Sequence, residues 1–127
     1  MEKKILLTAL FFGFISIVLG AFGAHALKKV LSVDQLSSFE VGVRYMMYHA
    51  LFLLFIGTTQ WLLPEQKNII YYLTLIGTLF FSVSIFLLST SNATGINFKF
   101  LGPITPIGGL LLITSWALVF YYVIVKK

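Results

Sequence analysis

Cysteine is absent from this 127-residue chain, and charged residues are scarce. Without cysteine there is no disulfide, no thiolate metal site, no cysteine nucleophile and no lipid anchor of the lipobox type. Charged residues make up only 10% of the chain, whereas a soluble domain carries roughly a quarter. The scarcity of charge therefore argues against a soluble protein.

Apolar residues make up 59% of the sequence, and aromatic residues make up 17%. Spanning the hydrocarbon core of a bilayer, about 30 Å thick, takes roughly 20 helical residues. Four apolar stretches of this length fit in the chain, at about residues 5–24, 45–63, 69–88 and 106–125. The sequence predicts an all-α integral membrane protein, a single domain over residues 1–127 with four transmembrane helices.

The first apolar stretch lies between two lysine pairs, Lys3-Lys4 and Lys28-Lys29. Its basic start and the small residues on both sides of His25 also fit a cleaved signal peptide. The stretch is longer than a usual signal core and contains three glycines. A retained first span is therefore the preferred interpretation.

Residues 28–43 form an amphipathic stretch between the first and second spans. Ser32 and Gln35 have the spacing of a capping box, and apolar residues such as Leu36 and Phe39 then recur at helical spacing. The pattern predicts a short interfacial amphipathic helix that leads into the second span.

Proline and threonine mark two helix ends. Pro64 predicts the end of the second span, because proline cannot continue a helix in the ordinary way. Thr105 is a good N-cap, and Pro106 suits the first position of the fourth helix.

The positive charges, which give a net charge of +5, lie singly or in pairs at the ends of apolar runs. This placement is typical of membrane helices and predicts no nucleic-acid partner. Four spans place both termini on one face of the membrane. That face carries five lysines, against four lysine or arginine residues opposite, which favours cytoplasmic termini.

Four polar groups are candidates for a site near one membrane face: His25, Arg44, His49 and the start of the fourth helix at Thr105. Ionisable residues inside a membrane are costly and by default suggest a function. With His49 one turn inside the second span, all four would lie at similar depth and could hold a lipid head group or small anion. The alternative is that the imidazoles bond to backbone carbonyls or the polar loop and lock helices together.

The sequence predicts no catalytic residue, cofactor or metal. A metal site needs more ligands than two histidines. The chain shows no nucleophile elbow, phosphate loop or dinucleotide fingerprint, and the spans contain no carboxylate of the kind that ion-coupled carriers use. We therefore expect a protein that is not an enzyme.

Small residues recur at a spacing of three or four along the first helix and open the fourth, where another helix backbone can approach closely. The expected helix-packing residues are Ala9, Gly13, Ser16, Gly20, Gly23, Ala24, Gly108 and Gly109. With little mass outside the bilayer, the chain is expected to act by association, as an oligomer or as an accessory subunit of a membrane complex. The alternative is a binding or permeation module for a lipid head group or small anion at a His25/His49 layer.

Three strings of the sequence are similar to a known family: Gly20-Ala21-Phe22-Gly23-Ala24-His25-Ala26-Leu27, Tyr48-His49-Ala50-Leu51 and Thr105-Pro106-Ile107-Gly108-Gly109. The chain resembles, over essentially its whole length, the small bacterial membrane proteins grouped as domain of unknown function 423, whose animal relatives are called transmembrane protein 256. The resemblance implies a four-helix protein of the bacterial inner membrane. It implies no activity and no cofactor.

Overall fold

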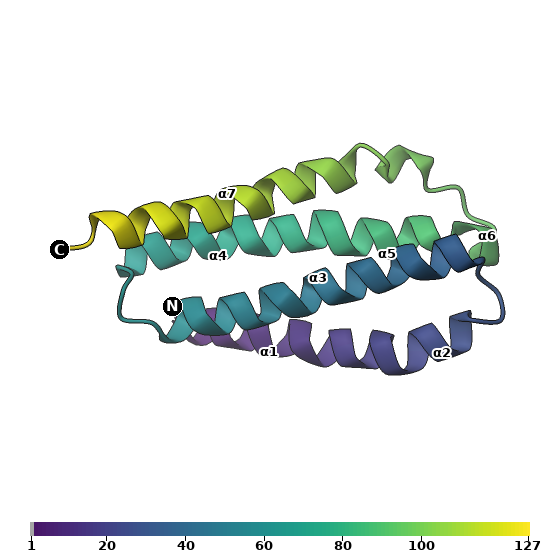
Figure 1. The fold of residues 1–127 in the computed structure, drawn as a ribbon, viewed down its shortest axis with the longest axis horizontal. Coiled ribbons are helices and arrows are strands. Elements are labelled where there is room, and N and C mark those ends of the chain that lie inside the picture. Colours follow the sequence, from purple (N-terminus) through teal and green to yellow (C-terminus); the bar gives the residue numbers. More distant parts are fainter. Residues whose placement is uncertain (1) are drawn as a thin grey trace.

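The computed structural model describes residues 2–127, apart from the side chain of Ala24, and these residues form helices and no strand (Figure 1). Two helices contain a π-helical turn, and a 3-10 turn precedes the last helix. In chain order the elements are α1 (Glu2–Val18), η1 (Leu19–Gly23, π), α2 (Ala24–Leu27), α3 (Val33–Thr58), α4 (Pro64–Thr78), η2 (Leu79–Val83, π), α5 (Ser84–Ser89), α6 (Ser91–Thr94), η3 (Lys99–Leu101, 3-10) and α7 (Ile104–Val125).

These elements join into four rods that are long and apolar enough to cross a membrane. The rods are Glu2–Leu27, Val33–Thr58, Pro64–Ser89 and Lys99–Val125. A rod of 26 residues is roughly 39 Å long, so it exceeds a hydrocarbon core of about 30 Å. The predicted four-span membrane architecture is confirmed.

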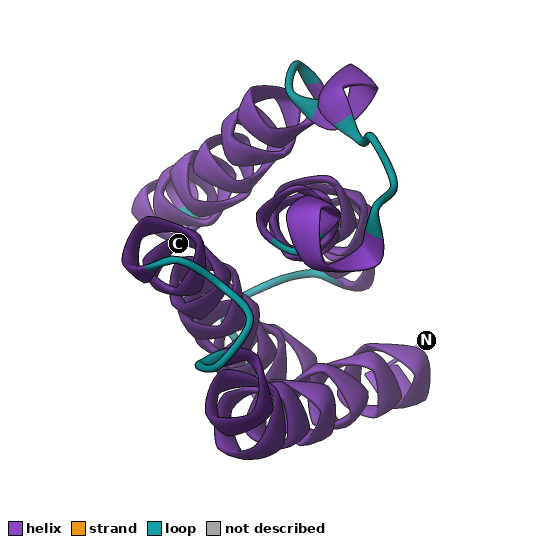
Figure 2. Cartoon of the chain, turned by 90° about the vertical axis from the view of Figure 1, so that its right-hand side faces the viewer, coloured by secondary structure: helices purple, strands orange, loops and turns teal. Residues whose placement is uncertain are grey.

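The four rods run up and down, and each packs against its neighbour in the sequence. α1 packs along α3, α3 packs against α4, η2 and α5, and α4 and η2 pack against α7. Figure 2, an end view, shows the rods obliquely crossed rather than parallel. Both termini lie at the same end as the short link between α3 and α4 (Figure 1), as the four-span topology predicts.

The capping box predicted at Ser32 starts α3. The Gln35 backbone N–H donates to Ser32 Oγ at 3.1 Å, and the Ser32 N–H donates to Gln35 Oε1 at 3.0 Å. These bonds satisfy two backbone donors that a helix start leaves without an internal partner. The predicted interfacial segment differs from the structure in one respect: it is not a separate helix, because α3 continues unbroken from Val33 to Thr58.

Close packing explains why this segment continues in line with the second span. A Cβ at Gly42 would lie 2.7 Å from the ring of Phe86 in α5, so glycine brings the two helices together. Ser82 of η2 donates to the Gly42 carbonyl at 2.8 Å. Phe39, one turn earlier, is buried with its ring centroid 5.1 Å from that of Phe86. The apolar side of the segment therefore packs against protein.

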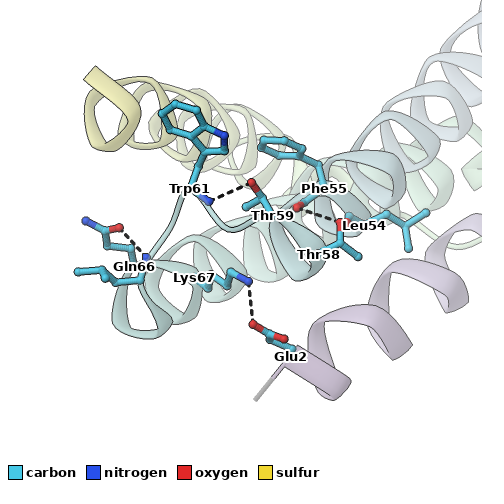
Figure 3. Close-up of polar contacts among 9 residues, drawn as sticks. Glu2, Leu54, Phe55, Thr58, Thr59, Trp61, Gln66 and Lys67 are labelled. Atoms are coloured by element: carbon cyan, nitrogen blue, oxygen red, sulfur yellow. Dashed lines mark hydrogen bonds and ion pairs between the residues drawn. The ribbon is translucent and has the colours of Figure 1, made fainter. Parts of the chain in front are cut away.

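Pro64 begins α4 and does not end the second span, which corrects the sequence prediction. α3 ends at Thr58, and the Leu63 backbone N–H donates to Gln66 Oε1 at 2.9 Å (Figure 3). Proline fits the first turn of a helix because the N–H that it lacks has no partner there. Residues 59–63 therefore form the link between the two rods.

A polar clasp joins the start of α1 to the start of α4. Lys67 is buried and donates to Glu2 Oε1 at 2.8 Å (Figure 3). The Lys4 ammonium donates to Asn68 Oδ1 at 2.9 Å and to the Tyr72 hydroxyl at 3.1 Å. A buried ammonium needs such a partner, so the clasp fastens the two rods at the terminal end of the bundle.

Candidate functional site

His49 is the best-defined polar group within the spans. Its side chain is buried, with Nδ1 2.7 Å from the Tyr45 carbonyl oxygen and Nε2 accepting a bond from Trp116 Nε1–H at 3.0 Å. A carbonyl only accepts and an indole N–H only donates, so the proton belongs on Nδ1 and the free lone pair on Nε2. The neutral imidazole therefore satisfies both partners at once.

The bond from Trp116 joins α3 to α7 through side chains. Within residues 2–127, the backbones of these two helices do not pack together as those of α1 and α3 do. The indole also lies against Phe52, with ring centroids 4.3 Å apart. The sequence prediction missed Trp116, which stands in an apolar run 67 positions from His49. Trp116 is about half exposed on the bundle, but an indole N–H in hydrocarbon still needs an acceptor, and this was the available signal.

The structure does not bring His25 and His49 together. A Cβ at Gly13 would lie 3.8 Å from Ala50, so His49 is nearly level with Gly13 of α1. His25 lies roughly 18 Å further along that rod at 1.5 Å per residue. Because α3 begins at Val33 rather than near Tyr45, His49 is deep in the bundle instead of one turn inside it. His25 is exposed at the far end.

Arg44 and Thr105 lie at separate places near that end. Arg44 is exposed and borders a groove between α1 and α3. Thr105 bonds through its hydroxyl to Ser84 of α5. It is not the N-cap of the fourth helix, because α7 begins at Ile104 and Pro103 occupies the cap. Thr105 borders a different cleft, of about 520 Å³, together with Asp34 of α3.

The small residues predicted for helix packing lie mostly at contacts within the chain. Ala9 and Ser16 are buried, and Gly13, Gly20 and Gly23 face Ala50, Val43 and Phe39 of α3. At the start of α7, a Cβ on Gly108 would lie 2.5 Å from the backbone nitrogen of Phe81, whereas one on Gly109 would lie 3.8 Å from its ring. The side chain of Ala24 lies outside the described residues. The first helix therefore uses its small-residue side to pack against α3.

An open groove lies between α3 and α7, and Trp116 divides it into two clefts. One cleft, of about 450 Å³, is bordered by Tyr45, His49, Phe81 and Ile113 among others. The other, of about 440 Å³, is lined by apolar and aromatic side chains: Tyr48, Leu51, Phe52, Phe55, Trp116, Val119 and Phe120. Among residues 2–127, no three His, Asp or Glu side chains gather to hold a metal ion. Because mainly apolar and aromatic side chains border both clefts, the groove can contact acyl chains or another helix.

Comparisons with known proteins agree with the architecture. The family model "Protein of unknown function (DUF423)" matches residues 19–109. A UPF0382 membrane protein of Staphylococcus haemolyticus is 41% identical over 101 residues, which cover 80% of this chain and 79% of the relative. The UPF0382 inner membrane protein YgdD of Escherichia coli K12 is 29% identical over 121 residues, which cover 92% and 86%. No solved structure matches.

Proposed function

This chain belongs to the DUF423 family, and from that premise we propose that it is a non-enzymatic inner-membrane protein that works by helix association. It would act as an oligomer or as an accessory subunit of a larger membrane complex. The observation that supports this proposal is the open groove between α3 and α7. Two rods of the bundle are joined there by the Trp116–His49 bond and aromatic contacts, and their backbones stay apart.

The chemistry of the groove suits another helix in the membrane. Because lipid tails are as apolar as leucine, helix association in a bilayer depends on van der Waals contact and hydrogen bonds. Rings arranged along a groove supply a large, rigid contact area, and aromatic pairs add about 0.5–1.5 kcal/mol beyond the area they bury. α7 offers Ile113 beside the groove, and this residue is 66% exposed. A helix of a second copy could fill this space.

The first partner to test is a second copy, because most oligomers are symmetric and a two-fold axis places the same surface of both copies in contact. The natural absence of cysteine makes single-cysteine variants clean probes. Ile113→Cys lies at the groove, and Phe14→Cys, with 64% exposure on the outer side of α1, is the matched control.

Thiol cross-linking in native membranes should give a dimer of twice the chain mass for Ile113→Cys and little for Phe14→Cys. Cross-linking that is equal in both variants, or absent at Ile113→Cys, would count against the groove as the associating surface. A cross-linked product of another mass would favour the accessory-subunit form of the proposal over the oligomer.

The alternative function, binding of a lipid head group or small anion by a His25/His49 layer, has less support. His49 uses both ring nitrogens within the chain, and His25 is at a different depth. This geometry favours the interpretation of His49 as a lock between helices. We also propose that the termini face the cytoplasm, since Lys3, Lys4, Lys67, Lys126 and Lys127 belong to the terminal end.

A further inference from the structure

Arg44 is a charged side chain inside the membrane-spanning rod Val33–Thr58, and it has no ionic partner among residues 2–127. A Cβ at Gly20 would lie 3.4 Å from Val43, so Arg44 is nearly level with Gly20, inside the first rod. Among residues 2–127 the ion pair joins Lys67 and Glu2, and Arg44 forms no ion pair. Glu40 lies one helical turn earlier in α3, but it forms no ion pair with Arg44.

An unpaired guanidinium at this depth is costly unless it reaches the interface or meets an anion. Its long apolar stem lets the charge extend toward the head groups while the methylenes stay in hydrocarbon. Lipid phosphate is the abundant anion at that level, and a guanidinium binds phosphate with two parallel hydrogen bonds. The position of Arg44 therefore calls for a phosphate partner from the bilayer.

A groove beside Arg44 can receive the rest of such a lipid. It has a volume of about 320 Å³ and lies between α3 and the first rod, at the junction of α1 with the π-helical turn η1. The first rod lines it with Ser16, Ile17, Gly20 and Ala21, and α3 lines it with Val43, Arg44, Met47 and Tyr48. The small residues of η1 leave room where larger side chains would close the contact. Apart from Arg44, the walls are mainly apolar and suit an acyl chain.

We propose that this groove binds one anionic phospholipid, with its phosphate on the Arg44 guanidinium and one acyl chain along Gly20 and Ala21. The net charge of the lipid matters because Lys28 and Lys29 lie in the link at the same end of the bundle. Positive charge at a membrane face attracts anionic head groups. This site goes beyond the proposed association and lies on the other flank of α3, with Tyr48 bordering both grooves.

Lipid retention by the full chain tests the proposal. The protein is reconstituted in nanodiscs that contain equal amounts of phosphatidylglycerol and phosphatidylcholine, then released into mild detergent, and native mass spectrometry counts the bound lipids. The parent should retain one phosphatidylglycerol in preference to phosphatidylcholine. Arg44→Gln should lower that retention about tenfold, because the glutamine amide can still donate to the phosphate but one of the two charge-assisted hydrogen bonds is lost.

Two further variants separate the site from general charge and from misfolding. Lys99→Gln removes one exposed positive charge at the same end and should retain phosphatidylglycerol as the parent does. Ala21→Trp keeps Arg44 but fills the groove from its exposed side, and it should lower retention while thermal stability stays unchanged. Equal retention by Arg44→Gln and the parent, an equal loss in Lys99→Gln, or equal retention of both lipids by the parent would overturn the proposal.

Discussion

The two flanks of α3 are built differently. Toward α1, small residues let the backbones approach, and Ala9 and Ser16 are buried between the rods. Toward α7, aromatic side chains bridge the gap between the two backbones. The side-chain hydrogen bond from Trp116 to His49 joins the two helices. In a membrane, small residues let two helices stay in contact along their length. A side-chain bridge joins two helices at one point along their length and leaves a cleft on each side of it. The first flank is therefore structural, and the second is the surface on which association is proposed.

The largest expected effect comes from the close contact that α7 makes with η2, which is built like the first flank. Gly108→Ala should lower the free energy of unfolding by about 3 kcal/mol, because the added Cβ would meet backbone atoms that cannot rotate away. Gly109→Ala is the matched control, since its Cβ would reach ordinary contact with the Phe81 ring. Thermal unfolding in detergent measures both. Equal stability of the two variants would contradict the close backbone contact between α7 and η2.

The flank toward α1 should be the next most sensitive. Ala9→Leu places three extra carbons at a site that is 1% exposed, and overpacking costs about 1–3 kcal/mol. Ala117→Leu makes the same change at an exposed position of α7 and should leave the melting temperature unchanged. If Ala9→Leu were as stable as Ala117→Leu, the α1–α3 contact would be looser than the structure shows.

The bridge on the flank toward α7 should contribute less. Trp116→Phe keeps the ring contact with Phe52 but removes the indole donor, which should cost about 1 kcal/mol. His49→Gln keeps a donor and an acceptor, so it should be more stable than His49→Leu. Thermal stability of the three variants decides this. If the bridge does not stabilise the fold, all three variants will unfold at the same temperature as the parent.

The smallest effect on stability is expected at the open groove itself. Ile113→Ala should change the free energy of unfolding by less than about 0.5 kcal/mol, because the residue is mostly exposed. It should nevertheless lower the fraction of protein that forms the proposed dimer. The oligomer profile in mild detergent measures this, with Phe14→Ala on α1 as the control. A profile unchanged by Ile113→Ala would remove the groove from the association proposal.

The sequence by itself determined the four spans, because hydrocarbon thickness and backbone hydrogen bonding leave an apolar stretch of this length few other structures. It also determined the capping box at Ser32, since two side chains three residues apart complete it. Only the tertiary structure decided that α3 continues through residues 33–43, because Phe39 and Gly42 find their packing partner more than 40 residues away in α5. That continuity moved His49 away from His25 and toward Trp116. Depth and partner depend on how helices pack against one another, which hydropathy along a single chain does not describe.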